Sequence, residues 1–170
     1  SADGAFALRL LNEKYKLNIP TQDLIAYAAK LGSDCPFFII NKACYATGRG
    51  EILKPIQLDL LNYYFVLVNP GIHVNTKWAF EQIIPGPSKQ NIVSILEQPI
   101  EEWRKYLFND FEAPITKAHP MIGVIKDQLY QLGASYAAMS GSGSTLFGIF
   151  KTKPSDTIKS SFDCSVFITS

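Results

Sequence analysis

A short stretch rich in glycine and serine, residues 139–150 (MSGSGSTLFGIF), is the first place in this sequence where binding chemistry could occur. Its small residues would let a ligand or a second backbone segment approach closely. Loops of this composition often bind phosphate groups, but most of them do so at the start of a helix. This one runs into the apolar segment 145–150, which predicts a strand. Because Gly and Ser also form tight turns, the residues alone leave a hairpin connection and a ligand-binding loop both open.

Two familiar phosphate-binding motifs do not fit this stretch. A Walker A loop needs a Lys after its last glycine and then a helix, and Gly141, Gly143 and Gly148 are followed by no such Lys. The dinucleotide-binding fingerprint also fails, because Leu146 stands where a third glycine would matter. The loop is therefore predicted to connect two central strands of a sheet.

A second candidate is Asp34, in the segment GSDCP at residues 32–36. A carboxylate can accept a proton from a hydroxyl group or orient that hydroxyl for attack. Aspartate is also a common turn residue, and from its spacing alone this segment is interpreted as a turn. Metal chemistry is not predicted, because His73 and His119 lie far apart without the spacing of metal ligands.

The composition bounds the class of protein. Hydrophobic residues make up 47% of the 170 residues and charged residues 18%, which is typical of a folded chain. With a net charge of +1 and no run of more than two Lys or Arg residues, we expect no nucleic-acid partner. No window approaches the roughly 18 consecutive apolar residues of a membrane span. The three cysteines form no C-x-x-C pair, so we expect reduced thiols and a cytoplasmic location.

The order of predicted elements indicates an α+β fold in two parts. From residue 63 onward the pattern is strand, helices, strand, strand, helix, strand, which is the βαββαβ order of a ferredoxin-like sandwich. Residues 1–62 supply two helices, the first with Ser1 at its N-cap, and then two extended runs, at 36–40 and 44–56, interpreted as a hairpin. Because such elements make a poor core alone, we expect residues 1–62 to be the remainder of a larger upstream domain and 63–170 to be the ferredoxin-like domain.

Several blocks of the sequence resemble the GHMP kinases, the superfamily of galactokinase, homoserine kinase and mevalonate kinase. The loop MSGSGSTLFGIF is similar to their third motif, and Ser1-Ala2-Asp3 is similar to the end of their second. Four further blocks are similar, in the same order, to those superfamily members that phosphorylate 4-diphosphocytidyl-2-C-methyl-D-erythritol: LGSDCPFFI, ATGRGEILKPI, VNPGIHVNTKWAF and NDFE. The resemblance covers nearly the whole chain.

This resemblance implies a small-molecule kinase of the non-mevalonate isoprenoid pathway, which transfers a phosphoryl group from ATP, with Mg²⁺, to the 2-hydroxyl of that substrate. It places Asp34 as the catalytic aspartate beside the acceptor hydroxyl. It places five residues near the phosphates of ATP: Ser1, Gly141, Ser142, Gly143 and Ser144. It also places Thr76 at the substrate, although Asn75 and Thr76 equally resemble the start of a helix.

The resemblance also implies that part of the enzyme precedes Ser1, including a lysine that pairs with the aspartate and the glycines of the second motif. We therefore expect the 170 residues alone to lack kinase activity. We also expect the apolar faces of residues 1–62 to be left exposed, which favours self-association or a homodimer. Two alternatives remain open: another GHMP kinase such as homoserine kinase, and a non-catalytic ferredoxin-like module that binds a ligand.

Overall fold

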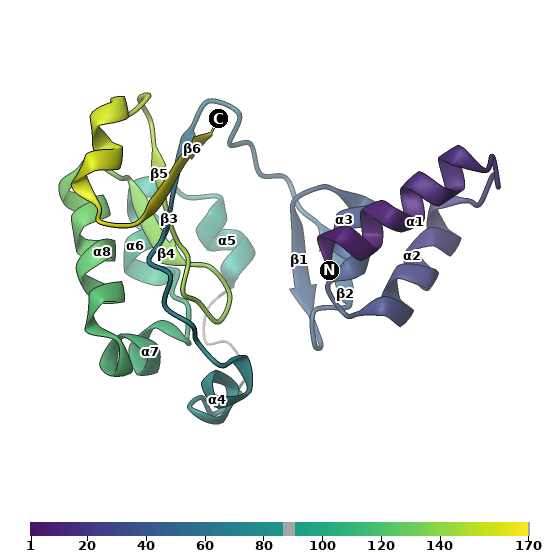
Figure 1. The fold of residues 1–170 in the computed structure, drawn as a ribbon, viewed down its shortest axis with the longest axis horizontal. Helices are drawn as coiled ribbons and strands as arrows, with labels where there is room; N and C mark the ends of the chain where they lie inside the picture. Colours follow the sequence, from purple (N-terminus) through teal and green to yellow (C-terminus); the bar gives the residue numbers. More distant parts are fainter. Residues whose placement is uncertain (87–90, 170) are drawn as a thin grey trace. The chain divides into compact units, whose positions relative to one another are not determined.

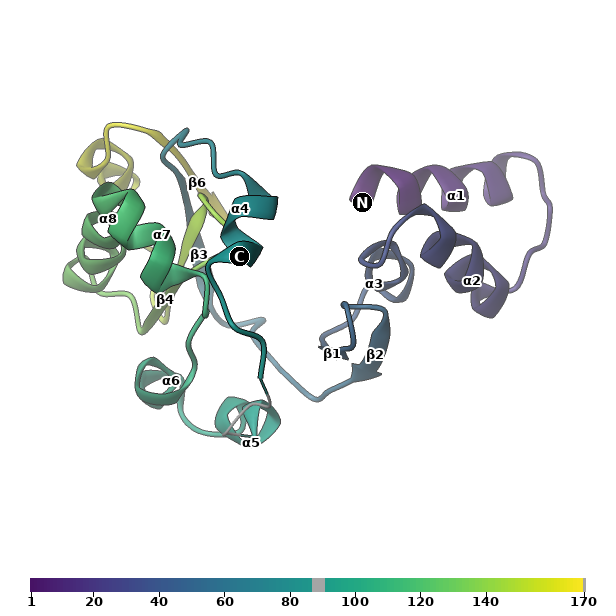
Figure 2. The same cartoon turned by 90° about the horizontal axis from the view of Figure 1, so that it is seen from below.

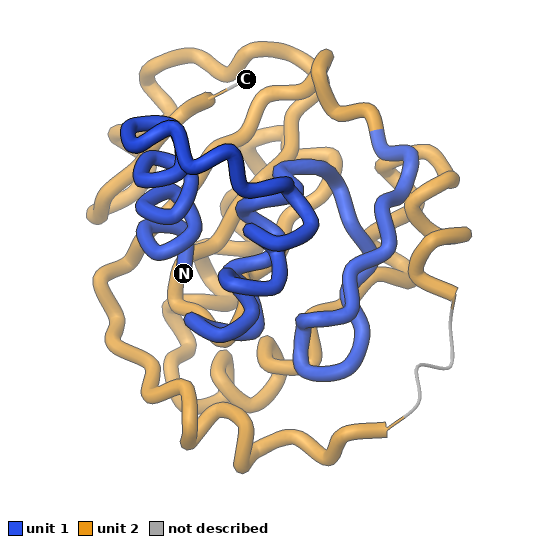
Figure 3. The backbone as a smooth tube through the Cα atoms, turned by 90° about the vertical axis from the view of Figure 1, so that its right-hand side faces the viewer, with its two compact units in different colours: residues 1–58 blue, residues 59–170 orange. Residues whose placement is uncertain are grey.

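A computed structural model of the chain describes residues 1–86 and 91–169. The chain divides into two compact units, unit 1 at residues 1–58 and unit 2 at residues 59–170 (Figure 3). The sequence predicted a division four residues later, after residue 62. Its assignment of the two parts to an upstream domain and a C-terminal domain stays a prediction.

Unit 1 consists of three helices and one β-hairpin (Figure 1). The elements are α1 (Ala2–Lys14), α2 (Thr21–Leu31), α3 (Cys35–Ile40), β1 (Cys44–Thr47) and β2 (Ile52–Pro55). The strands are antiparallel and pair Cys44 with Pro55 and Thr47 with Ile52. The three helices enclose a core of five buried side chains: Ala5, Leu24, Ala28, Cys35 and Ile39.

The prediction of an extended run at residues 36–40 was wrong, because this segment forms α3. Pro36 lies in the first turn of the helix, where its fixed φ is suitable and its missing N–H costs nothing. Asn41 ends the helix in a left-handed conformation, with φ of 50°. A short apolar run such as PFFII does not distinguish a buried strand from a buried helical turn. The hairpin lies entirely within the second predicted run.

Unit 2 has the predicted α+β ferredoxin-like sheet. Its strands are β3 (Tyr64–Asn69), β4 (Tyr136–Met139), β5 (Leu146–Phe150) and β6 (Ser165–Thr169). They lie in the order β4-β5-β3-β6, and every neighbouring pair is antiparallel. This is the order that a βαββαβ chain produces when each helical connection passes over the sheet.

Most helices of unit 2 come between β3 and β4 in the sequence. They are α4 (Thr76–Glu81), α5 (Ile92–Leu96), α6 (Ile100–Tyr106), α7 (Glu112–Ala118) and α8 (Pro120–Gln131). The helix predicted at residues 154–162 is a 3-10 helix, Asp156–Ser161. Figure 2 shows α7 and α8 together beside the sheet. The buried face of α8, with Ile122, Ile125 and Leu129, joins Val66 and Val68 of β3 in the main core.

The edge strand β4 is held by side chains from two helices. The Tyr130 hydroxyl, at the end of α8, accepts a hydrogen bond from the Ala137 N–H (3.1 Å) and donates one to the Ala137 carbonyl (3.2 Å). On α6, the Trp103 ring packs edge-on against Tyr136, with ring centroids 5.7 Å apart. Burial raises the pKa of Tyr136, so its hydroxyl stays protonated and donates to the Leu107 carbonyl (3.2 Å).

The apolar face predicted on the first helix is exposed. Only Ala5 of α1 is buried, whereas Phe6, Leu10 and Tyr15 are each at least 50% exposed. This agrees with the expectation of exposed apolar faces in residues 1–62, while the self-association inferred from it stays a prediction. Across residues 1–86 and 91–169, no helix is long and apolar enough to cross a membrane.

Candidate functional site

The glycine- and serine-rich segment forms a tight hairpin connection, as predicted, between β4 and β5. The prediction that both strands are central was wrong for β4, which lies at the edge of the sheet. The N–H of Ser140 donates to the Thr145 carbonyl (2.8 Å), and the N–H of Gly143 donates to the Ser140 carbonyl (3.0 Å). The N–H of Gly143 therefore serves the turn and is not free for a phosphate group. Within the described residues, the N–H groups of Gly141, Ser142 and Ser144 have no recorded partner, so they are the better candidates for binding an anion.

Two positions in this loop favour glycine. Gly141 has φ of 55° and Gly143 has φ of 87°, a region that other residues rarely adopt. A Cβ at Gly143 would also lie 2.7 Å from Sδ of Met139, which is 2% exposed. The side chain of Ser144 is buried, at 8% exposed, so it can contribute to a site mainly through its backbone. The loop is thus packed directly on the end of β4.

Thr76 lies beside the loop. Its expected contact with the substrate stays a prediction. Its Oγ1 is 3.3 Å from Oγ of Ser142, and either hydroxyl can be the donor. Thr76 is also the first residue of α4, whose N-cap Asn75 accepts a hydrogen bond from the Trp78 N–H (3.0 Å). Both interpretations of Thr76 are thus compatible with its position, because a helix start lies against the loop.

Asn109 and Glu112 also contact the loop, and neither was predicted to be a site residue. The Asn109 Nδ2 donates to the carbonyls of Met139 and Gly141, each at 2.8 Å. Glu112 accepts a hydrogen bond from the Met139 N–H (2.6 Å) and forms an ion pair with Lys126. Both residues belong to the block NDFE, residues 109–112, whose similarity to the GHMP kinases implied no role for either side chain. Their polar types, just before α7 for Asn109 and at its first residue for Glu112, were the available signal.

Asp34, the predicted catalytic residue, lies in an exposed turn of unit 1 immediately before α3. It occupies the N-cap position, but its side chain makes no capping hydrogen bond. Its Oδ1 accepts a hydrogen bond from the Ser33 hydroxyl (3.3 Å). The carboxylate therefore keeps accessible lone pairs that could accept a proton from an acceptor hydroxyl.

The turn of the β1–β2 hairpin lies against Asp34. A Cβ added to Gly50, which has φ of 108°, would lie 3.1 Å from Oδ1 of Asp34. The turn is fixed by Glu51, whose carboxylate accepts a hydrogen bond from the Arg49 N–H (2.7 Å). Bonds from the backbone N–H groups of Glu51 and Arg49 lower the pKa of the Glu51 carboxyl. The block ATGRGE thus builds a turn that contacts the predicted catalytic carboxylate.

Ser1 stands at the N-cap of α1, where the sequence placed it, but its side chain makes no capping hydrogen bond. Ser1 and Asp34 belong to unit 1, whereas Thr76 and the loop at 139–145 belong to unit 2. The structure brings together Thr76 and the loop in one unit, and Asp34 and Gly50 in the other. That all of them form a single site stays a prediction.

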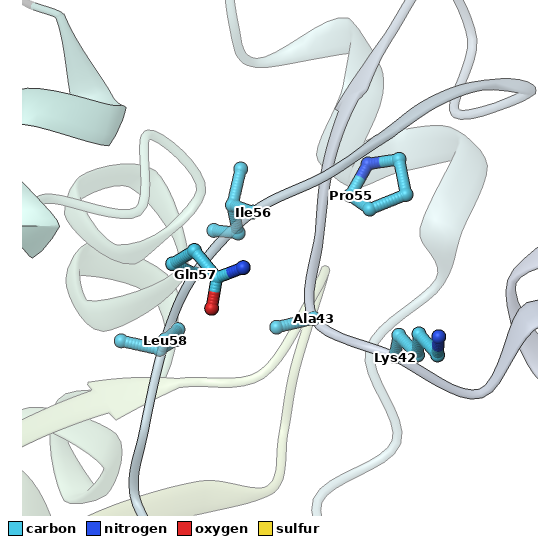
Figure 4. Close-up of a pocket in the computed structure, with 6 residues that line it drawn as sticks. All are labelled: Lys42, Ala43, Pro55, Ile56, Gln57 and Leu58. Carbon is cyan, nitrogen blue, oxygen red and sulfur yellow. The ribbon is translucent and has the colours of Figure 1, made fainter.

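Each unit also has a pocket. The pocket of unit 1, about 440 Å³, is lined by Lys42, Ala43, Pro55, Ile56, Gln57 and Leu58 (Figure 4), and contains no predicted site residue. The pocket of unit 2, about 610 Å³, includes Asn109, Glu112 and Lys126 in its lining. In the described part of the chain, no three side chains of His, Cys, Asp or Glu converge as metal ligands.

The sequence matches known proteins over most of its length. Residues 91–168 match the sequence profile of the GHMP kinases C-terminal family. A protein of Bacteroides fragilis named 4-diphosphocytidyl-2-C-methyl-D-erythritol kinase is 49% identical over 88% of this chain. A protein of Porphyromonas gingivalis with the same name is 38% identical over 91% of it. The chain spans 55% and 57% of the lengths of these two relatives.

Solved structures also resemble the chain, and two of them are kinases. A crystal structure of 4-(cytidine 5'-diphospho)-2C-methyl-D-erythritol kinase matches 96% of this chain and 61% of its own, with a TM-score of 0.78 and 27% identity. A homoserine kinase from Cytophaga hutchinsonii matches 94% of this chain and 61% of its own, with a TM-score of 0.62 and 17% identity. The second likeness shows a shared fold only.

Proposed function

Because the chain belongs to the GHMP kinase family, we propose that the protein that carries it transfers a phosphoryl group from ATP to the 2-hydroxyl of 4-diphosphocytidyl-2-C-methyl-D-erythritol. The main support is the 49% identity over 88% of this chain to a kinase named for that substrate. The chain spans little more than half of such relatives, so the activity is proposed for the whole protein. The 170 residues alone are expected to be inactive.

Asp34 is proposed as the residue that handles the proton of the acceptor hydroxyl. The hydroxyl oxygen attacks the γ-phosphorus, the bond from that phosphorus to the leaving oxygen of ADP breaks, and the hydroxyl proton passes to the carboxylate. An exposed aspartate with one recorded side-chain hydrogen bond is suited to this role. Gly50 supports it, because a residue without Cβ lets the hairpin turn approach the carboxylate.

The loop at 139–145 is proposed to bind the phosphates of ATP. Backbone N–H groups at Gly141, Ser142 and Ser144 would stabilise the negative charge that spreads over the phosphate oxygens. Thr76 would contact the substrate beside this loop, since its hydroxyl lies 3.3 Å from that of Ser142. Ser1, at the positive end of α1, would add to phosphate binding.

Mg²⁺ is proposed to enter with ATP as its phosphate-bound counter-ion. The described residues offer no cluster of three acidic or imidazole ligands, so phosphate oxygens would supply much of its coordination. A cytoplasmic location is proposed as well. The cysteines Cys35, Cys44 and Cys164 are all free thiols, as is usual in a reducing compartment.

The proposal is tested by assaying the protein that carries this chain with ATP and two acceptors, 4-diphosphocytidyl-2-C-methyl-D-erythritol and homoserine. We expect turnover of the first acceptor only. Turnover of homoserine instead would favour the second kinase, whose fold the chain shares. The absence of any phosphoryl transfer would favour a module that binds a ligand without catalysis.

The role of Asp34 is tested with Asp34→Asn, which keeps the shape of the side chain and removes its charge. We expect kcat to fall by about 10²- to 10⁴-fold, the usual range for loss of a general base. The matched control is Asp23→Asn, another exposed aspartate of unit 1, in the first turn of α2. It should leave kcat within about twofold of the parent value. An equal loss in both variants would remove Asp34 from the mechanism.

A further inference from the structure

The geometry points to Asn109 and Glu112 as positioning residues that hold the loop at 139–145 in its binding conformation. This inference rests on the proposed function, in which that loop binds the phosphates of ATP. The two residues lie in the short segment before and at the start of α7. They contact the loop from one side, and Thr76 contacts it from α4.

Met139 is the point at which this segment holds the loop. Glu112 accepts the hydrogen bond from the Met139 N–H (2.6 Å), and Asn109 donates to the Met139 carbonyl (2.8 Å). Both backbone polar groups of the last residue of β4 are therefore bonded to side chains of residues 109–112. Asn109 also donates to the Gly141 carbonyl (2.8 Å), two residues into the loop. One side chain thus bridges the end of the strand and the start of the loop.

The two positioning side chains are themselves held. The Oδ1 of Asn109 accepts a hydrogen bond from the Phe111 N–H (3.0 Å), which fixes the orientation of its amide group. The second carboxylate oxygen of Glu112 is paired with Lys126 of α8, and their side chains are 15% and 27% exposed. The Tyr136 hydroxyl bonds the Leu107 carbonyl just upstream. The segment is therefore attached to α8 and β4, two elements that border the core.

A loop of this composition needs such support. Glycine has the largest backbone freedom of any residue, so ordering a loop with Gly141 and Gly143 costs more entropy than ordering an average one. Ordering the loop before the nucleotide arrives removes that cost from binding. Loss of the Asn109 bonds should therefore weaken binding of ATP more than it slows the chemical step.

The test is Asn109→Asp in the protein that carries this chain. Asp keeps the acceptor for the Phe111 N–H but loses both donor hydrogens and presents a carboxylate to two carbonyl oxygens. We expect KM for ATP to rise about tenfold, with kcat and KM for the acceptor changed by less than about threefold. The matched control is Asn91→Asp, which keeps its recorded bond from the Ser94 N–H (3.3 Å) and should leave KM unchanged.

A second measurement follows the loop directly. The N–H groups of Ser140 and Gly143 are bonded within the turn, so their hydrogen exchange reports whether the turn is closed. In Asn109→Asp these amides should exchange about tenfold faster than in the parent, and in Asn91→Asp at the parent rate. If Asn109→Asp does not fold, Glu112→Gln replaces it. We then expect a smaller rise, of about threefold, in KM for ATP and in the hydrogen-exchange rates of these two amides.

The outcomes separate the two proposals. A parent protein that turns over ATP while Asn109→Asp keeps its KM for ATP and its exchange rates would overturn the positioning role and leave the kinase proposal intact. A parent protein without kinase activity would overturn the proposed function. The exchange measurement would then still decide whether Asn109 holds the loop. A fall in kcat with equal rises in KM for ATP and for the acceptor would indicate a general structural defect. That outcome would also count against the positioning role.

Discussion

The two units bury their apolar residues very differently. The core of unit 1 consists of five side chains, two of them Ala, between three helices. The core of unit 2 contains large side chains from the sheet, from α7 and from α8, among them Val66, Ile115 and Leu129, each 0% exposed. Half of the large apolar side chains that are exposed in the described residues belong to unit 1, which has about a third of the chain.

From this difference we expect unit 2 to fold as an independent domain and unit 1 to be unstable by itself. Folding must offset a loss of conformational entropy of roughly 1–2 kcal/mol per residue, mostly through buried apolar surface. A sheet with helices packed on it should bury enough surface, whereas three short helices around the five buried side chains of unit 1 should not. The apolar side chains exposed on α1 are the surface that we expect a further layer of structure to cover.

The expected difference in stability between the two units is tested most directly by producing them separately. Residues 59–170 should unfold cooperatively in urea, with a single transition. Residues 1–58 should show no transition and the circular dichroism of a largely unfolded chain, because their core is too small. Far-ultraviolet circular dichroism against urea concentration makes the measurement. A cooperative transition of residues 1–58 alone would overturn the comparison.

A smaller effect is expected when one leucine is shortened in a helix of each unit. Leu129→Ala in α8 should lower the free energy of unfolding by about 2–5 kcal/mol, because the side chain is 0% exposed and its removal leaves a cavity. Leu10→Ala in α1 should change it by less than about 0.5 kcal/mol, because that side chain is 61% exposed. Urea titrations of both variants give the two values. A large loss from Leu10→Ala would show that the face of α1 is covered in solution.

The smallest difference in unfolding free energy between the two units is expected at their glycine turns. Gly143→Ala should cost about 2–3 kcal/mol, because φ is 87° and the new Cβ would meet the buried Met139. Gly50→Ala should cost about 1–2 kcal/mol, because φ is 108° but the neighbouring Asp34 side chain is exposed and can shift. The control is Gly86→Ala, where an added Cβ meets no described atom within 4 Å. Thermal unfolding ranks the three variants, and equal costs at Gly143 and Gly50 would contradict the argument.

The fold of unit 2 could be predicted from the sequence because its signals are local and consistent. The helix at 120–131 has Ile122, Ile125 and Leu129 at helical spacing, and the strands are apolar runs bounded by turn residues. Residues 36–40 could not be predicted in the same way. Five residues are too few for a helical period to show, and only the packing of α3 against α1 and α2 decides the outcome.

The candidate site was predicted only in part for a related reason. Sequence similarity marks positions such as Asp34 and the loop at 139–145, but it does not give hydrogen-bond partners. The bonds from Asn109 to Met139 and Gly141 join residues about 30 positions apart, and no local pattern in the chain predicts such a contact. Which N–H groups of the loop are already used by the turn also became visible only in the folded backbone.

The two hydrogen bonds between the Tyr130 hydroxyl and the backbone of Ala137 affect how the chain can assemble. Because one side chain occupies both the N–H and the carbonyl that Ala137 turns outward, an incoming chain cannot extend the sheet at β4. The opposite border, β6, presents an alternating strand whose Phe167 is 62% exposed. Any oligomer that continues this sheet from one molecule into the next would therefore pair β6 of one molecule with β6 of another. Because each sheet offers only that edge, such an oligomer would be a dimer.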